Sequence, residues 1–289
     1  MSPYPSASAT VDLKVTLASC AAKKQRHEKI TCLTAYDYPF ARLLDEAGID
    51  ILLVGDSWAM ASAGEESTLP VTMDEMLVAT RSVRRAVKRA LVVADMPFGS
   101  YHLSQRQAVR NAIRMVKEAG AEAVKLEGGA ARADIVCAIV AAEVPVMGHI
   151  GLTPQSVNRQ SGYHVQGTTA EGAERLLRDA AAIETAGAFA LVLEGVPREL
   201  AAKITERAAI PTIGIGAGPD CDGQVLVVHD LLGLSFRPRP KFVRPYADLA
   251  TAVRTAAEAY RQDVEAGQFP ADGESYHMPQ ATKVQGAWK

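Results

Sequence analysis

The stretch that decides the fold is DILLVGDS, residues 50–57. Four apolar residues, 51–54, are followed by Gly55 and then by a carboxylate, Asp56. A short, continuous apolar run is typical of a parallel strand that is covered on both faces. Because side chains alternate along a strand, we expect Asp56 to continue the buried row of Leu52 and Val54. A buried aspartate needs a partner, so this strand end predicts a site that attracts positive charge.

The same pattern occurs at four further places in the chain. Each apolar run stops at an ionisable residue, and these residues are Asp95, Glu127, His149 and Glu194. A helical or turn-rich stretch follows each run, as in a parallel sheet built from strand–helix units. Strand ends of such a sheet lie on one side. The sequence therefore predicts that the five ionisable side chains gather on a common face.

Composition limits the classes of protein that fit. The chain has 289 residues, of which 48% are hydrophobic, so it can bury a large core. This length suits two domains or one (β/α)₈ barrel of about 250 residues. The formal charge of −2 and the pI near 6.3 argue against nucleic acid or an anionic membrane as a partner.

Cysteine usage and the absence of targeting signals indicate the compartment. Cys20, Cys32, Cys137 and Cys221 lie far apart with no CxxC pair, which argues against structural zinc and favours a reducing compartment. No run approaches the roughly 18 apolar residues of a membrane span. The first ten residues, MSPYPSASAT, do not resemble a signal peptide, and we expect them to be disordered. We therefore expect a soluble, cytoplasmic protein.

Alternating strand and helix patterns fill the rest of the chain. The predicted strands cover residues 30–36, 51–54, 91–95, 123–127, 145–149, 190–194, 211–216 and 225–229. The predicted helices cover residues 17–24, 39–47, 73–89, 105–119, 131–142, 170–186, 198–208 and 247–265. Residues 58–70 are predicted to form a loop of small residues. Residues 151–167 form a long glycine-bearing loop of the kind that is often functional.

These elements predict an α/β fold, a single-domain (β/α)₈ TIM barrel, with a doubly wound open sheet as the alternative. We expect an N-terminal extension and short helix over residues 1–28, a catalytic barrel over residues 29–265, and a peripheral tail over residues 266–289. Active sites of such barrels lie at the carboxyl ends of the strands.

Three of the strand-end acids have a second interpretation. Asp56, Asp95 and Glu127 are each able to cap the following helix. Three like charges on one face of a barrel repel one another, however, unless a cation binds or a carboxylate is protonated. All three offer oxygen ligands, and no cysteine or histidine cluster accompanies them. That donor set suits Mg²⁺ or a similar hard ion.

The remaining strand-end residues also allow two interpretations each. Lys125 lies on the same strand face as Glu127 and is either a structural counter-ion or a group that binds a substrate carboxylate. His149 is either a satisfied buried histidine or part of the site. Glu194 follows four apolar residues and is the candidate general base. Its alternatives are a helix cap and an ion pair with Arg198.

A glycine-rich stretch, GIGAG at residues 214–218, follows the seventh predicted strand. In barrels this turn often binds phosphate. It contains no lysine or arginine, so close strand packing is the alternative explanation for its glycines.

A set of motifs in fixed order carries a resemblance to a known family. The chain closely resembles the ketopantoate hydroxymethyltransferases over residues 29–260. The matching motifs are VGDS (54–57), STLPVT (67–72), ADMPF (94–98), VKLEGG (124–129), GHIGLTPQSV (148–157), LVLEGVP (191–197), IPTIGIGAG (210–218), VVHDLLGL (227–234) and RPKF (239–242).

The resemblance implies a (β/α)₈ barrel and a reaction. Family members transfer a hydroxymethyl group from 5,10-methylenetetrahydrofolate, the co-substrate, to α-ketoisovalerate (3-methyl-2-oxobutanoate). The product is 2-dehydropantoate, in the first step of pantothenate biosynthesis, and the reaction proceeds through Mg²⁺-assisted enolate formation. The resemblance also implies a homo-oligomer, a decamer.

The same resemblance implies roles for individual residues. Asp56 and Asp95 are expected to bind Mg²⁺, with Glu127 at the metal or its waters. Because the substrate chelates this metal, Asp56 and Asp95 also count as substrate-binding residues, with Ser57, Lys125 and His149. Glu194 is expected to remove the proton from C3.

Some positions depart from the family pattern. Trp58, Ala59 and Met60 stand where the family usually reads LGM, and residues 61–66 form an unusual loop, so we expect a narrower pocket or altered folate access. Gly99 and Gly195 replace larger residues.

Two alternative functions remain. One is a Mg²⁺-dependent C–C lyase or mutase of the phosphoenolpyruvate mutase/isocitrate lyase group, although the chain has no cysteine loop similar to the KKCGH of that group. The other is a non-catalytic paralogue.

Overall fold

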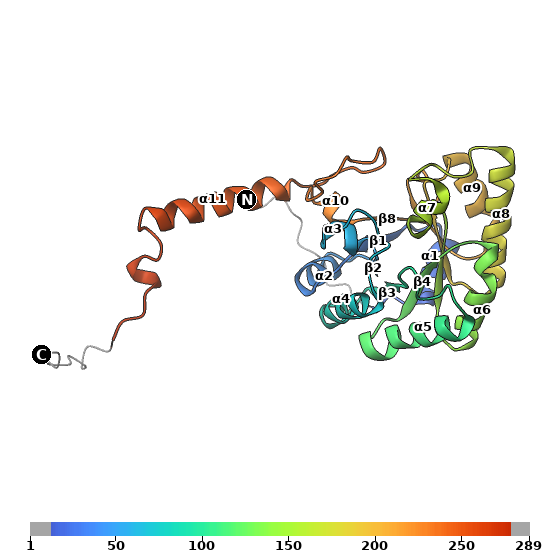
Figure 1. Cartoon of the computed structure of the whole chain (residues 1–289), viewed down its shortest axis with the longest axis horizontal. Helices are drawn as coiled ribbons and strands as arrows, with labels where there is room; N and C mark the ends of the chain where they lie inside the picture. Colours follow the sequence, from blue (N-terminus) through green and yellow to red (C-terminus); the bar gives the residue numbers. More distant parts are fainter. Residues whose placement is uncertain (1–12, 279–289) are drawn as a thin grey trace, which may run out of the picture.

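Eight parallel strands pair in chain order, and β8 pairs with β1 to close a barrel (Figure 1). This computed structural model describes residues 13–278. The strands are β1 (Ile30–Thr34), β2 (Ile51–Val54), β3 (Leu91–Asp95), β4 (Ala123–Glu127), β5 (Val146–Gly151), β6 (Ala190–Glu194), β7 (Thr212–Ile215) and β8 (Gly223–Leu226). The prediction of a (β/α)₈ barrel is confirmed, and the open sheet is excluded. The expected disorder of residues 1–10 and the end of the predicted tail lie outside the described residues.

Helices cover most of the barrel. The α-helices are α1 (Leu17–Gln25), α2 (Tyr38–Glu46), α3 (Trp58–Ala61), α4 (Met73–Ala86), α5 (Gln105–Ala119), α6 (Ala133–Ala141), α7 (Val157–Gln160), α8 (Ala170–Thr185), α9 (Arg198–Arg207), α10 (Val228–Leu231) and α11 (Leu249–Glu265). Short 3₁₀ turns are η1 (Ala130–Arg132), η2 (Pro154–Ser156) and η3 (Asp272–Glu274). No helix in the described part of the chain combines the length and apolar character of a membrane span.

Local sequence signals explain where the covering helices begin and end. At the start of α4, Thr72 and Glu75 form a capping box, each accepting a hydrogen bond from the backbone N–H of the other. The side chain of Ser104 caps α5 in the same way, and α5 ends at Gly120. Gly120 has a φ of 77°, a conformation that glycine adopts without the strain of a β-carbon.

Alternate residues of each strand belong to two separate apolar layers. Ile51 and Leu53 point into the barrel, whereas Leu52 and Val54 pack between the barrel and its helices. Asp56 is buried as predicted, but it lines the cavity at the barrel mouth and does not continue the row of Leu52 and Val54, so that part of the prediction is wrong. Gly55 holds the inward position instead, and the chain turns after β2, which brings Asp56 to the barrel mouth.

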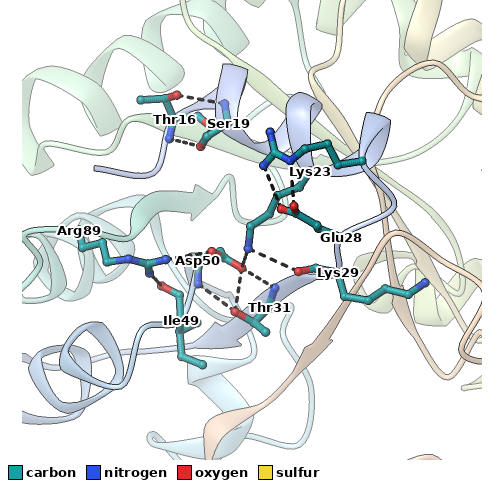
Figure 2. A network of polar contacts seen from close by, with 10 residues as sticks. Thr16, Ser19, Lys23, Glu28, Lys29, Thr31, Ile49, Asp50 and Arg89 are labelled. Atoms are coloured by element: carbon teal, nitrogen blue, oxygen red, sulfur yellow. Dashed lines mark hydrogen bonds and ion pairs between the residues drawn. The ribbon is translucent and has the colours of Figure 1, made fainter. Parts of the chain in front are cut away.

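The N-terminal segment closes the opposite end of the barrel. Lys23 of α1 donates to Asp50 Oδ2 at 2.6 Å, just before β2, and Arg89 Nη2 approaches Asp50 Oδ1 at 3.2 Å (Figure 2). The backbone N–H and hydroxyl of Thr31 also donate to Asp50. Lys24 similarly pairs with Asp222 at 2.7 Å before β8. These contacts attach α1 to the amino ends of the strands, away from the predicted site.

Three features differ from a regular alternation of strands and helices. The predicted loop over residues 58–70 begins with a helix, α3, so that prediction is wrong in part. The connection from β7 to β8 contains no helix. The last helix, α11, stands clear of the barrel, and none of its residues is buried (Figure 1). The outer face of the barrel near β8 and β1 is consequently open, and Gln224 and Thr31 are exposed in mid-strand.

Candidate active site

A cavity of about 200 Å³ opens at the carboxyl ends of the strands. It is lined by every residue that the sequence predicted for the site: Asp56, Ser57, Asp95, Lys125, Glu127, His149 and Glu194. The five strand ends therefore do converge on one face. Inward strand positions carry Asp95, Lys125, Glu127, His149 and Glu194, which explains why they share the barrel mouth.

Lys125 and Asp95 form an ion pair at the centre of this cavity. Lys125 Nζ lies 2.5 Å from Asp95 Oδ1, and both side chains are buried. Burial opposes the charge on Lys125, but Asp95, Glu127 and Asp56 outweigh it and raise the pKa of this lysine. Burial also raises the pKa of Asp95 in spite of Lys125. Lys125 is therefore a cation that the surrounding acids hold in its charged form.

Asp56 is buried near two other carboxylates, Asp95 and Glu127. Its backbone N–H donates to Asp95 Oδ2 at 3.0 Å, and its Oδ2 accepts from Gln155 Nε2 at 2.8 Å. Burial and the charges of Asp95 and Glu127 raise the pKa of Asp56 well above its ordinary value. A cation beside Asp56 would relieve this repulsion.

His149 connects two carboxylates. Its Nδ1 is 3.5 Å from Glu127 Oε1, and its Nε2 is 3.2 Å from Glu194 Oε2. Burial and Lys125 oppose protonation of His149, but Glu127 and Glu194 outweigh them and raise its pKa to about 9. The pKa of Glu127 is lowered although burial opposes this, because His149 and Lys125 lie next to it. Glu127 is thus an ionised carboxylate held between two basic side chains.

Ser57 forms the wall of the cavity next to β1. Its hydroxyl lies 2.9 Å from the Tyr36 hydroxyl. A β-carbon on Gly55 would come within 2.7 Å of Ser57 Oγ. Gly55 therefore leaves the space that the Ser57 hydroxyl uses.

The charges of the cavity suit a divalent cation. The basic side chains of the cavity are Lys125 and His149. Its carboxylates outnumber them and are Asp56, Asp95, Glu127, Glu194 and Asp230. Within residues 13–278, no group of three or more acidic, histidine or cysteine side chains is arranged to hold a metal. The donor set fits an ion such as Mg²⁺, which takes one or two carboxylates and keeps several waters.

Comparison with known proteins identifies the family. Residues 14–272 match the sequence profile described as ketopantoate hydroxymethyltransferase. The chain belongs to the ketopantoate hydroxymethyltransferase family. It is 61% identical over 271 residues to a 3-methyl-2-oxobutanoate hydroxymethyltransferase of Koribacter versatilis, covering 94% of this chain and 92% of that protein. It is 57% identical over 263 residues to the protein of the same name in Geobacter metallireducens, covering 91% and 98%.

Solved structures of similar fold share little sequence with this chain. A phosphonopyruvate hydrolase in complex with oxalate and Mg²⁺ aligns with a TM-score of 0.58 and 15% identity, over 89% of this chain and 92% of that chain. A 2,3-dimethylmalate lyase of the phosphoenolpyruvate mutase/isocitrate lyase superfamily aligns with a TM-score of 0.57 and 19% identity, over 90% and 91%. At this identity the likeness concerns the barrel fold alone.

In this member of the ketopantoate hydroxymethyltransferase family, the site acids do not cap helices. The N-caps of α3, α5 and α6 are Ser57, Ser104 and Arg132. Glu194 does not pair with Arg198 either, because Arg198 binds Asp220 at 2.5 Å, and the N-cap of α9 is Pro197. The alternative roles as helix caps, and for Glu194 as an ion-pair partner of Arg198, are therefore not observed for these acids.

The unusual glycines and Trp58 have structural explanations. Trp58 packs against the core and lines a separate hollow, whereas Met60 lines the catalytic cavity. Gly99 and Gly195 have φ values of 85° and 55°, which favour glycine. In the GIGAG turn, a β-carbon on Gly214 would come within 3.1 Å of Gln224 Nε2 on β8, which agrees with close strand packing, and one on Gly216 would come within 2.7 Å of the Phe242 ring in a later loop.

Sequence reasoning missed several residues of the cavity. Tyr163 and Phe242 line the cavity. Gln155 and Tyr101 are buried next to it: Gln155 contacts the carboxylates of Asp56 and Glu127, and the Tyr101 hydroxyl contacts Gln155 and the backbone of Glu127. Gln155 lies inside a family motif, GHIGLTPQSV, and this motif was the available signal. Tyr101 has no comparable signal, because nothing in the sequence indicates that its hydroxyl points at Glu127.

Proposed function

We propose that this chain transfers a hydroxymethyl group from 5,10-methylenetetrahydrofolate to 3-methyl-2-oxobutanoate (α-ketoisovalerate). The product is 2-dehydropantoate, and the reaction begins pantothenate biosynthesis. The relatives that share 53–61% of their residues with this chain carry the name of this enzyme. The observation that carries the proposal is the convergence of Lys125, Asp56 and Asp95 in one cavity with the separate carboxylate of Glu194.

A bound Mg²⁺ is part of this proposal. Asp56 and Asp95 would hold the ion, and Glu127 would contact it or its waters. When bound, it would supply a Lewis acid that stabilises negative charge on the α-keto acid. The excess of carboxylates in the cavity supports such a site, as does the raised pKa of Asp56, which results from burial and from the charges of Asp95 and Glu127.

The side chains of this chain then divide the remaining work. Ser57 and the Lys125 ammonium bind the substrate, and Lys125 places a positive charge where the enolate develops. Glu194 takes the proton from C3. Water hydrolyses the methylene bridge of the folate, which breaks both of its C–N bonds and releases the one-carbon unit at the oxidation level of formaldehyde. The C3 carbon then forms a bond to this unit, and the oxygen of the unit takes a proton to become the hydroxyl group of the product. His149, 3.2 Å from Glu194 Oε2, keeps this carboxylate oriented.

Residues 151–167 are the proposed lid over this reaction. Tyr163 of this segment lines the cavity entrance, and its hydroxyl lies 4.0 Å from Met60 Sδ on the opposite wall. Closure of such a segment excludes water from the reacting groups.

The activity of a C–C lyase or mutase is the second candidate. Its only support is the similarity of the barrel to the solved structures of that group. Folate-independent cleavage of a keto acid would favour it. A paralogue without catalysis would show neither activity.

We also propose a homo-oligomer, a decamer, in the cytoplasm. The uncovered face near β8 and β1, and the exposed helix α11, are surfaces that other copies would cover. Four free thiols suit a reducing compartment.

Deuterium wash-out from C3 of α-ketoisovalerate, followed by NMR with and without Mg²⁺, tests the first half-reaction. We expect exchange that depends on Mg²⁺, and 2-dehydropantoate only when methylenetetrahydrofolate is added. Absence of exchange under all conditions would contradict the proposal.

A further inference from the structure

Four buried polar contacts of the site involve Gln155. It lies in η2, within the loop over residues 151–167, and it is buried. Its Oε1 accepts from the Tyr101 hydroxyl at 2.6 Å. Its Nε2 donates to Asp56 Oδ2 at 2.8 Å and to the Met96 carbonyl at 3.0 Å, and its backbone N–H donates to Glu127 Oε2 at 3.0 Å. One residue of the loop therefore touches two carboxylates of the cavity.

Tyr101 fixes the orientation of the Gln155 amide. The Tyr101 hydroxyl accepts the backbone N–H of Glu127 at 3.2 Å, so its single proton is free to go to Gln155 Oε1. The carbonyl of Met96 and the carboxylate of Asp56 both need donors, and among the described residues the side-chain donor to each is the NH₂ group of Gln155. The reversed amide would place an oxygen against two acceptors. The network thus permits one orientation.

This orientation leaves one oxygen of Asp56 available. The amide of Gln155 occupies Oδ2 with a neutral donor, so it adds no positive charge that would compete with a cation. Within the described residues, no hydrogen-bond donor contacts Asp56 Oδ1. Asp56 is therefore held at a fixed angle, and its Oδ1 is available to a cation.

We propose that Gln155 is a positioning residue that orients Asp56 for a divalent cation and couples the loop over residues 151–167 to the carboxylates. The inference rests on the proposed metal site at Asp56. Partners that orient a metal-binding side chain affect metal affinity by about 10–100-fold when they are removed. Because the same side chain anchors the loop, a change that weakens cation binding should also make the loop easier to cleave by a protease.

The test compares Gln155→Met with a matched control in the same loop, Gln160→Met. Gln160 bonds only within its own loop, to Thr153 and Gly151, and does not contact an acid. Mg²⁺ affinity is measured by calorimetry on the full chain without substrate. Loop protection is measured as the rate of tryptic cleavage after Arg159, the only lysine or arginine in residues 151–167.

We expect Gln155→Met to weaken Mg²⁺ binding about 10–100-fold and Gln160→Met to leave it within about twofold. Mg²⁺ should slow cleavage after Arg159 in the wild type and in Gln160→Met, but not in Gln155→Met. Tyr101→Phe removes only the hydroxyl that orients the amide, and it should weaken Mg²⁺ binding in the same direction if Gln155→Met does not fold. Wild-type affinity in both Gln155→Met and Tyr101→Phe would overturn the inference.

Asp56→Asn separates this outcome from a failure of the proposed metal site. If the wild type binds Mg²⁺ and Asp56→Asn does not, the site stands, and the Gln155 variants decide the positioning role. If Asp56→Asn binds Mg²⁺ as the wild type does, the proposed metal site and the role of Gln155 are both wrong.

Discussion

At the scale of single residues, Glu194 differs from the other acids of the cavity. Asp56, Asp95 and Glu127 are almost fully buried, whereas the Glu194 side chain is 17% exposed. We expect Glu194→Gln to lower C3 deuterium exchange by about 10²–10⁴-fold, because it removes the base and keeps the shape. Mg²⁺ and α-ketoisovalerate should bind as in the wild type, measured by calorimetry. Unchanged exchange would place the base elsewhere.

Gly55 provides a second test at this scale. Its backbone is not in the left-handed region, so alanine meets no backbone strain there. The added β-carbon would instead displace the Ser57 hydroxyl and weaken its bond to Tyr36. We expect Gly55→Ala to raise KM for the keto acid about fivefold, which corresponds to the loss of one hydrogen bond worth about 1 kcal/mol. The melting temperature should stay close to that of Gly273→Ala, an exposed control with no atom near its β-carbon. An unchanged KM would argue against substrate contact by Ser57.

The predictability of the site has a physical basis. Lys125, Glu127, His149 and Glu194 sit on strands whose register follows from uninterrupted apolar runs, so their convergence could be predicted. The path of Asp56 could not be derived by counting along β2, because the chain turns at Gly55 and leaves the strand alternation. The contacts of Gln155 and Tyr101 depend on how a loop folds over the barrel mouth. A periodic sequence pattern does not predict the conformation of such a loop.

At the scale of elements, α1 stabilises the barrel through Asp50. Burial opposes ionisation of Asp50, but hydrogen bonds from Lys23 and Thr31 outweigh it and lower its pKa. The 4% exposed carboxylate therefore stabilises the fold in its charged form. We expect Lys23→Met to lower the free energy of unfolding by roughly 2 kcal/mol, less than for a fully buried pair, because Lys23 is 26% exposed. Urea unfolding measures this, with the exposed pair variant Arg42→Met as a control that should change little.

The lowered pKa of Asp50 also determines how the free energy of unfolding changes with pH. Because the folded-state pKa lies below the unfolded value of about 3.9, the stabilisation is complete at neutral pH. It is lost as pH falls below about 4 and Asp50 becomes protonated in the folded state. We expect the difference in unfolding free energy between the wild type and Asp50→Asn to be large at pH 7 and to shrink towards pH 3. A difference that grew on acidification would contradict the assignment.

Elements also show where sequence patterns stop being informative. The bounds of α5 agree with the prediction, because a serine cap and a terminal glycine mark its ends. The prediction for residues 58–70 missed α3, a helix of four residues that is too short to show a periodic pattern. A helix was predicted over residues 247–265, and α11 covers Leu249–Glu265, but the sequence does not say which surface this helix packs on.

At the scale of the whole molecule, two exposed surfaces point to assembly. Val253, Tyr260 and Val264 of α11 are 56%, 59% and 45% exposed and recur at helical spacing on one side. The barrel in turn lacks a covering helix beside β8 and β1. A folded chain rarely leaves both an apolar stripe and a strand face in water. The two surfaces are therefore expected to be covered in the proposed homo-oligomer.

A charge on the apolar stripe tests this expectation. We expect Val253→Asp to lower the sedimenting mass towards that of smaller species, because a buried carboxylate without a partner destabilises an interface. The far-UV circular dichroism should keep the barrel spectrum, since α11 contributes no buried residue to the barrel. Thr255→Asp introduces the same charge on the other side of α11 and should leave the mass unchanged. If both variants sediment as the wild type does, α11 does not take part in assembly, and the proposed oligomer must form through another surface.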